Sequence, residues 1–203
     1  WSVLLATEAR VAEALPIGRS GIAFIVSLGF DAGWHRVRFY SQAFAHQMST
    51  FTLVQAVLPQ TSHPVFAAGG IMDGAGIAAM LQLGATGVQL GTAFVLCPES
   101  AANAAYRAAM KQASASGTEL TSAISGRQAR CLRNDFCDFS RDFATSDVPD
   151  YPLTYSLGKA LAAAAAAKQH HGFGAQWAGQ GAALAREMPA GELIKTLVRE
   201  WQG

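Results

Sequence analysis

Two glycine-containing turns follow short apolar runs, in positions where backbone N–H groups could bind an anion. Gly69 and Gly70 come directly after residues 64–68, and Gly91-Thr92 ends the next such run, residues 86–90. Glycine frees the backbone to turn and lets its N–H groups approach a ligand closely, while Thr92 adds a hydroxyl donor. Paired turns after consecutive strands are typical of a phosphate site. We therefore expect a phosphate-bearing ligand, held mainly by backbone groups.

His35 is the candidate for acid–base chemistry. It follows the apolar run 22–28 by a few residues, which places it beyond the carboxyl end of a strand, on the same face as the glycine turns. A neutral imidazole near pH 7 can accept a proton or hydrogen-bond an oxygenated substrate. A purely structural histidine is the alternative. His170-His171 has no third ligand at a suitable spacing, so no metal site is expected.

Short strands alternating with helices must position these residues. Apolar β-rich runs occupy residues 3–6, 22–28, 64–68 and 86–90. Helical patterns lie between them at residues 8–15, 50–58 and 74–83. Thr7 is the expected cap of the first helix and Pro16 its end, while Asp73 is the expected cap of the third. This alternation predicts βαβ units with a parallel sheet, in a barrel or an open doubly wound sheet.

The second half of the chain has a different pattern. Residues 99–115, 158–169 and 190–201 are predicted to be helical, and residues 117–146 to be polar and irregular. In that irregular part Arg127, Arg130 and Arg133 recur every three residues, which suggests either a solvated helix face or a contact with an anionic partner. We therefore divide the chain into a barrel part, residues 1–97, and a mostly helical segment, residues 98–203. That segment would pack on or cover the active face, and Phe173 and Trp177 could form a lid.

Composition excludes several classes of protein. Apolar residues make up 51% of the chain and charged ones 14%, with a mean hydropathy of +0.20. The net charge of +1 does not indicate the basic surface that binds nucleic acid. No apolar run approaches the roughly 20 residues that a membrane span needs. Cys97, Cys131 and Cys137 have no Cys-x-x-Cys pairing, so free thiols in a cytoplasmic protein are expected.

Four segments together resemble the nitronate monooxygenase family, formerly called 2-nitropropane dioxygenase. They are residues 31–36 (Asp-Ala-Gly-Trp-His-Arg), 67–74 (Ala-Ala-Gly-Gly-Ile-Met-Asp-Gly), 84–92 (Gly-Ala-Thr-Gly-Val-Gln-Leu-Gly-Thr) and 125–130 (Ser-Gly-Arg-Gln-Ala-Arg). The Gly-Gly and Gln-x-Gly-Thr pair is also found in FMN-dependent enoyl reductases. Residues 125–130 and 177–180 (Trp-Ala-Gly-Gln) favour the nitronate branch.

This resemblance implies a (β/α)₈ TIM-type barrel, a cofactor and a reaction. The cofactor would be FMN, and the catalytic residue would be His35. The residues implied to bind FMN are Gly33, Gly69, Gly70, Gln89, Leu90, Gly91 and Thr92. The reaction would be oxidation of an alkyl nitronate by FMN and O₂ to a carbonyl compound and nitrite. His35 would orient the nitronate or remove the α-proton of the neutral nitroalkane.

Three residues depart from the family pattern near the expected flavin ring. Trp34 and Val37 replace glycines beside His35, and Leu28 replaces a glutamine that commonly contacts flavin. Positive φ angles are unfavourable for tryptophan and more so for β-branched valine. Flavin binding is therefore better supported than turnover.

Two other functions remain open, and the barrel is expected to be incomplete. The alternatives are an FMN-dependent enoyl-thioester reductase and a catalytically idle fragment that acts as a scaffold. A full (β/α)₈ domain needs about 250 residues and eight strands, whereas the sequence provides four strands that match the family from its fifth onward. A missing N-terminal half or a partner chain would then complete the barrel.

Overall fold

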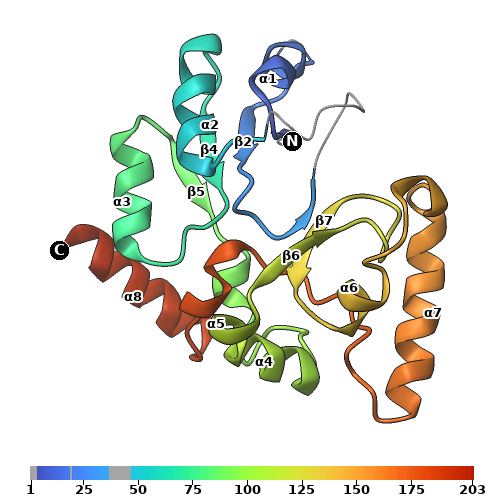
Figure 1. Ribbon diagram of the computed structural model, residues 1–203. Helices are drawn as coiled ribbons and strands as arrows, with labels where there is room; N and C mark the ends of the chain where they lie inside the picture. Colours follow the sequence, from blue (N-terminus) through green and yellow to red (C-terminus); the bar gives the residue numbers. More distant parts are fainter. Residues whose placement is uncertain (1–3, 19, 37–46) are drawn as a thin grey trace.

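Four parallel strands form the central sheet of the structure, a computed structural model that describes residues 4–18, 20–36 and 47–203. The strands are β1 (Leu5–Glu8), β2 (Phe24–Leu28), β4 (Val65–Ala68) and β5 (Gly87–Gln89). They lie in the order β1-β2-β4-β5, and every neighbouring pair is parallel (Figure 1). Chain order and sheet order coincide, as they do in a (β/α)₈ barrel. The predicted sheet of four parallel strands is confirmed.

The two faces of the sheet have different neighbours, because successive side chains of a strand point to opposite sides. Ile25 and Val65, which are partners in the register of β2 and β4, pack against Leu53. Val26 and Ala68, which lie an odd number of residues further along their strands, line a cavity on the other face. The helices of this half are α1 (Val11–Gly18), α2 (Thr50–Val57) and α3 (Gly74–Gln82). Both faces of β2 are therefore mostly apolar, as its sequence, apolar except for Ser27, predicts.

Side chains fix where two of these helices begin. The Ser49 hydroxyl accepts a hydrogen bond from the Thr52 N–H at the start of α2. The Asp73 carboxylate accepts one from the Gly76 N–H at 2.8 Å at the start of α3, so the predicted cap is confirmed. Gly84 follows the end of α3 with a φ of +106°, a backbone angle that favours glycine.

The predicted boundary between β1 and α1 was wrong. Thr7 does not cap a helix: it lies in β1 with Glu8, and α1 begins only at Val11. Glu8 is paired in register with Ser27 of β2, and this long-range pairing extends the strand past the local capping signal. Pro16 lies inside the eight-residue α1 instead of ending it. Proline has no backbone N–H, so at this position the helix lacks only one hydrogen bond.

Glu8 is a buried carboxylic acid at the carboxyl end of β1. The Ser27 hydroxyl donates to its Oε1, whereas its Oε2 is buried without a hydrogen-bond partner. Burial raises the pKa of Glu8 to about 7, and the hydrogen bond from Ser27 offsets this rise only in part. The folded protein therefore holds a proton on Glu8 at pH values where the unfolded chain has lost it.

We expect the free energy of unfolding to fall as pH rises from about 4.5, where Glu8 ionises in the unfolded chain, to about 7. Glu8→Gln mimics the protonated acid and should abolish this slope, which makes the variant more stable than the wild type at pH 8 by about 3 kcal/mol. Urea unfolding between pH 4.5 and pH 8 measures both curves, with the exposed Glu192→Gln as the control. Parallel pH profiles for Glu8→Gln and the wild type would contradict the burial argument.

A second, antiparallel sheet lies beside the carboxyl ends of the parallel strands. It consists of β3 (Trp34–His35), β6 (Thr118–Thr121) and β7 (Ala129–Leu132), in the order β3-β7-β6. Residues 117–146 were predicted to be irregular, so β6 and β7 are a correction. All four residues of β7 are buried, and its partner β3 lies far upstream in the sequence. Strands that pair over such a long distance leave little sign of their pairing in the local sequence.

The expected solvated helix face of Arg127, Arg130 and Arg133 was wrong in two respects: residues 129–132 form a strand and Arg130 is buried, although Arg133 is exposed. Arg130 is buried on β7, with its guanidinium carbon 4.6 Å from the centre of the Phe30 ring. Its Nε donates to the Phe30 carbonyl and its Nη1 to the Thr118 hydroxyl. Arg130 therefore ties the antiparallel sheet to the loop after β2.

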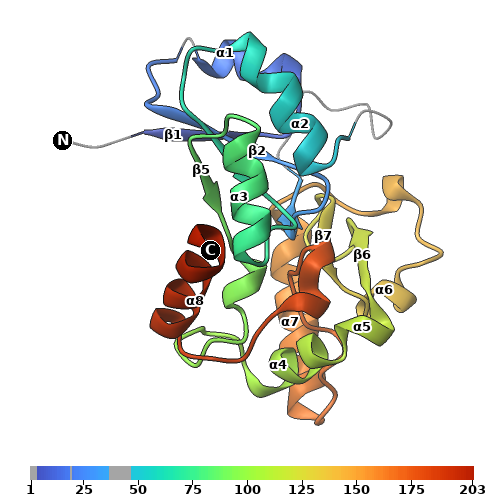
Figure 2. The same ribbon diagram turned by 90° about the vertical axis from the view of Figure 1, so that its left-hand side faces the viewer.

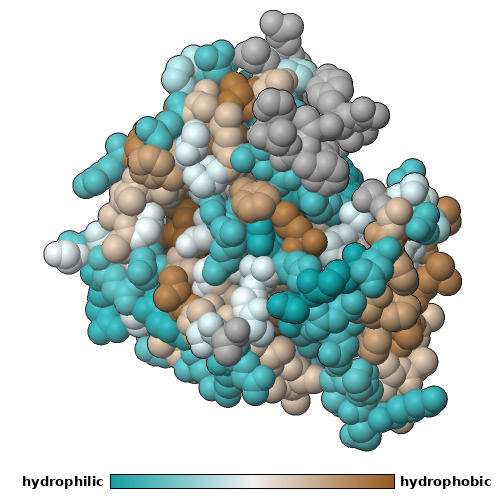
Figure 3. Space-filling view, in the orientation of Figure 1, coloured by the Kyte–Doolittle hydropathy of each residue, from teal (hydrophilic) through white to brown (hydrophobic). Residues whose placement is uncertain are grey.

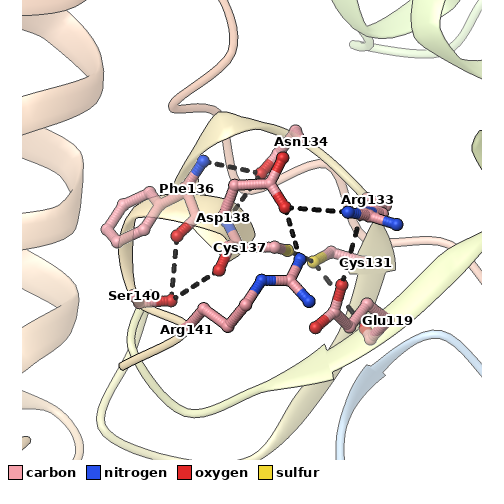
Figure 4. A network of polar contacts seen from close by, with 9 residues as sticks. All are labelled: Glu119, Cys131, Arg133, Asn134, Phe136, Cys137, Asp138, Ser140 and Arg141. Atoms are coloured by element: carbon pink, nitrogen blue, oxygen red, sulfur yellow. Dashed lines mark hydrogen bonds and ion pairs between the residues drawn. The ribbon is translucent and has the colours of Figure 1, made fainter. Parts of the chain in front are cut away.

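A polar network closes the end of the antiparallel sheet (Figure 4). Asn134 caps the short helix α6 (Asp135–Phe139), since its side chain accepts hydrogen bonds from two backbone N–H groups of that helix. The Sγ atoms of Cys131 and Cys137 lie 3.5 Å apart, and both residues are buried. All three cysteines are free thiols, as predicted.

Helices make up most of the regular structure after residue 98, as predicted. They are α4 (Ala104–Lys111), α5 (Ala113–Ser116), α6, α7 (Leu153–Ala167) and α8 (Ala190–Gln202). The chain returns to the parallel half at its end, because α8 lies against α3 in both views (Figures 1 and 2). Glu200 of α8 accepts a hydrogen bond from the Gly74 N–H at 3.0 Å and forms an ion pair with Arg186.

The longest helix, α7, packs through a glycine. A side chain at Gly158 would meet the Ile124 carbonyl oxygen at 2.4 Å, so the helix approaches the core closely at this position. Leu153 and Leu157 remain exposed, and Figure 3 shows hydrophobic side chains over this helix. Within the described residues, no helix has both the length and the apolar character that a membrane span requires.

Candidate functional site

A cavity of about 580 Å³ lies at the carboxyl ends of the parallel strands, between them and the antiparallel sheet. Strand ends, the loops that follow them and β3 form its wall. The structure brings all eight predicted site residues to this wall: Gly33, His35, Gly69, Gly70, Gln89, Leu90, Gly91 and Thr92. Thr7, Val26, Leu28, Trp34, Val95 and Trp177 are among the other lining residues.

The turn after β4 requires glycine at two consecutive positions. Gly69 has a φ of +120° and Gly70 a φ of +69°, angles that side chains strongly disfavour. A side chain on Gly69 would also meet the Thr50 hydroxyl oxygen at 2.7 Å. The sequence Gly-Gly is therefore explained by the sharp turn that brings this backbone to the cavity.

Three backbone N–H groups on the cavity wall have no acceptor within the described part of the chain. They belong to Gly70, Gly91 and Thr92. Gly91 immediately precedes the short 3-10 helix η3 (Thr92–Phe94), whose first N–H groups have no internal partner. The Thr92 Oγ1 accepts the Gly179 N–H at 3.0 Å, which leaves the hydroxyl hydrogen free to donate. These groups form a set of donors suited to an anion.

The N-terminus of helix α3, in contrast, already has carboxylate acceptors. Asp73 accepts the Gly76 N–H and Glu200 accepts the Gly74 N–H. A phosphate would meet like charge there, so the favourable anion position is the edge formed by Gly70 and Gly91-Thr92.

Gly33 has a packing role that the sequence did not reveal. A side chain at this position would meet the Ala178 carbonyl carbon at 2.6 Å and the Gly179 nitrogen at 2.7 Å. The Gln180 N–H also donates to the Asp31 carbonyl at 2.8 Å. The loop after β2 is therefore pressed against residues 178–180, and only glycine permits this approach.

The geometry around His35 indicates which of its nitrogens carries the hydrogen. Its Nε2 lies 2.9 Å from the Oγ of Ser125, and that Oγ lies 3.0 Å from the carbonyl oxygen of Arg127. A carbonyl oxygen can only accept, so the single hydroxyl hydrogen of Ser125 is donated to it. Ser125 must then accept from Nε2–H of neutral His35, which leaves a lone pair on Nδ1.

The charge state of His35 suits a proton acceptor. Burial lowers the pKa of this imidazole, and the positive charge of Arg127 lowers it further. His35 is therefore neutral at pH 7, with Nδ1 able to accept a proton or a hydrogen bond.

Aromatic rings surround the imidazole. Their centroids lie 5.2 Å (Tyr151), 6.1 Å (Tyr155), 5.3 Å (Trp177) and 5.7 Å (Trp34) from that of His35. Tyr151 and Tyr155 were not predicted to lie near His35: Tyr155 is in the first turn of α7, and Tyr151 is in the turn before that helix. Trp177, one of the two residues proposed for a lid, lines the cavity.

The three residues that depart from the family pattern, Leu28, Trp34 and Val37, differ in where the structure places them. Trp34 adopts a φ of +70°, at a cost of about 1–2 kcal/mol for a residue other than glycine. Its side chain is 60% exposed, so the indole extends away from the packed side of the loop. Leu28 lines the cavity, and Val37 lies outside the described residues.

Comparisons with known proteins identify the relatives of this chain. The sequence profile of the nitronate monooxygenase family matches residues 2–200. The nitronate monooxygenase of Pseudomonas aeruginosa is 51% identical over 191 residues, which are 94% of this chain and 54% of the relative. That of Paraburkholderia phytofirmans is 48% identical, over 97% of this chain and 54% of the relative. The chain therefore spans about half the length of the relatives it matches.

Solved structures also match this chain over almost its whole length. The nitroalkane oxidase of Streptomyces ansochromogenes superposes with a TM-score of 0.91 at 35% identity, over 99% of this chain and 58% of that one. FabK from Thermotoga maritima gives a TM-score of 0.80 at 28% identity, over 99% of this chain and 61% of that one. The parallel sheet and its helices are thus the C-terminal half of an α/β barrel. The chain belongs to the nitronate monooxygenase family.

Proposed function

We propose that the protein oxidises alkyl nitronates with FMN and O₂ to a carbonyl compound and nitrite. The observation that carries this proposal is a single cavity that joins His35 to the anion-binding edge of Gly70, Gly91 and Thr92. Membership of the nitronate monooxygenase family supports the reaction class.

The cavity has the properties that FMN requires. Its volume of about 580 Å³ lies within the range of roughly 300–1,000 Å³ typical of sites for small molecules and cofactors. The free N–H groups at one edge would hold the phosphate, while Val26, Leu28 and Ala68 would provide an apolar wall for the flavin ring. When bound, FMN supplies the redox chemistry.

The chain's own residues would bind the substrate and move one proton. Nδ1 of His35 would accept the α-proton of a neutral nitroalkane or a hydrogen bond from a bound substrate. Ser125 would hold the imidazole in the required tautomer. The rings of Trp177, Tyr151 and Tyr155 would exclude water from the imidazole.

We also propose that residues outside this chain complete the barrel. Relatives are nearly twice as long as this chain. Among the described residues, β1 and β5 each have one neighbour in the sheet, and Leu4 and Leu5 are exposed at the β1 edge. An N-terminal half or a partner chain would cover these edges, since unpaired strands associate readily.

An FMN-dependent enoyl-thioester reductase is the second candidate, and the likeness to FabK favours it. A catalytically idle scaffold is the third candidate, because Trp34 has a strained backbone beside His35. The deciding assay gives the flavin-loaded protein a small alkyl nitronate and, separately, NAD(P)H with an enoyl thioester. Nitrite release supports the proposal. Thioester-dependent NAD(P)H consumption without nitrite would replace it with the reductase, and no turnover of either would favour the scaffold.

Ser125→Ala is expected to lower kcat/KM for a neutral nitroalkane by about 3- to 10-fold, because a hydrogen bond of about 0.5–1.5 kcal/mol no longer fixes the tautomer of His35. Oxidation of the preformed nitronate should change less, since it needs no proton removal. Ser125→Cys retains a weak acceptor and should give an intermediate loss. Equal losses for both substrates would show that Ser125 has only a structural role.

A further inference from the structure

We propose that Trp34 makes the cavity selective for substrates that carry an aromatic ring, so that aryl-substituted nitronates are preferred to small alkyl ones. This inference rests on the proposed function. The residue lines the cavity beside His35, and its indole is 60% exposed. The other three rings near His35, those of Tyr151, Tyr155 and Trp177, are all less exposed than this indole.

The backbone of Trp34 is fixed from the side of the antiparallel sheet. Trp34 is paired with Arg130 of β7, and Arg130 is itself buried against Phe30. Arg36 donates to the Gly29 carbonyl at 2.6 Å and to the Ala32 carbonyl at 2.9 Å. The loop that carries Trp34 is thus bonded at both of its ends.

The same loop is also fixed from the opposite side. Gly33 touches the backbone of residues 178–179, and the Gln180 N–H bonds to Asp31. These contacts hold Trp34 at a φ of +70°, which glycine would adopt without strain. A strained residue persists where its surroundings over-determine it, and such residues cluster at ligand sites. The strain therefore points to a function for the indole.

The ligand suited to this position is a flat, apolar ring. Trp34 lines the same cavity as the apolar residues Leu28 and Val26. Aromatic pairs prefer centroid separations of about 4.5–7 Å, and the Trp34 and His35 rings are 5.7 Å apart. A substrate whose reacting carbon lies beside His35 can therefore place an attached ring against Trp34. The flavin ring is the other possible occupant, and the test separates the two.

The test compares Trp34→Gly with Trp34→Ala. Both remove the indole, but only glycine also relieves the backbone strain. In both variants we expect the ratio of kcat/KM for phenylnitromethane nitronate to that for ethylnitronate to fall about 10-fold, mainly through a higher KM for the aryl substrate. The glycine variant should have the higher thermal midpoint of the two. Trp201→Ala, which removes an exposed indole outside the cavity, is the control and should leave the ratio unchanged.

A binding measurement makes the result independent of turnover. Phenylacetate and propionate are unreactive carboxylates that resemble an aryl and an alkyl nitronate. Calorimetry should show a preference for phenylacetate in the wild type that both variants lose. Unchanged preference in both variants would overturn the inference, as would a change in the glycine variant alone. Weaker FMN binding with an unchanged substrate ratio would assign the indole to the flavin instead. A wild type that releases no nitrite but shows Trp34-dependent phenylacetate binding would refute the proposed function and support this inference.

Discussion

His35→Asn is expected to lower the oxidation of neutral nitroalkanes by about 10²–10⁴, the usual contribution of a positioned general base. The nitronate has already lost the α-proton, so its oxidation should fall far less. Nδ1 of His35 holds the lone pair that would take this proton in the proposed reaction, because Nε2–H is bonded to Ser125. Initial rates of nitrite release from a nitroalkane and from its preformed nitronate give the two losses.

The wild-type pH dependence gives an independent check of the same role. Because burial and Arg127 lower the pKa of His35, the nitroalkane rate should stay constant near pH 7 and fall only in more acidic solution. His63→Asn is the matched control, since His63 precedes β4 at the opposite end of the strand from the cavity. Equal losses for both substrates in His35→Asn would mean that His35 only positions them.

Gly91→Val is expected to weaken FMN binding by about 10²–10⁴, which corresponds to the loss of two or more bonds to a charged phosphate at about 1.5–3 kcal/mol each. The φ of Gly91 is −115°, which any residue can adopt, and a side chain there would meet no protein atom within 4 Å. The branched side chain should therefore leave the fold intact and occupy the space beside the phosphate donors. Fluorescence titration of FMN measures the affinity.

Gly191→Val is the matched control for this substitution. Gly191 also has open space around it, but it lies in α8 and outside the cavity. Circular dichroism should show the same fold for both variants. Unchanged FMN affinity in Gly91→Val would rule out the turn after β5 as the phosphate site.

The parallel half and its cavity were predictable because their signals are local. Each of the four apolar runs overlaps a parallel strand, and strand ends in such a sheet share one edge. Gly70 and Gly91 could therefore be placed together with His35 without knowledge of the structure. Their binding of FMN stays a prediction.

The antiparallel sheet was not predictable, because its pairing is set by residues far apart in the sequence. Trp34 pairs with Arg130, and every helix and strand from α2 to β6 lies between them in the sequence. Arginine at the centre of a buried strand is also contrary to strand patterns, and its contacts with Phe30 and Thr118 explain it. The same sheet carries Ser125 and the segment before α7 toward His35, so the tyrosines beside the imidazole were missed.

A crystal structure of the protein with FMN tests the central claim most directly. The account predicts that the phosphate lies within hydrogen-bond distance of the backbone nitrogens of Gly70, Gly91 and Thr92, with the flavin ring in the cavity beside His35. A phosphate held instead by the side chains of residues 127–133, or a flavin ring outside this cavity, would contradict it.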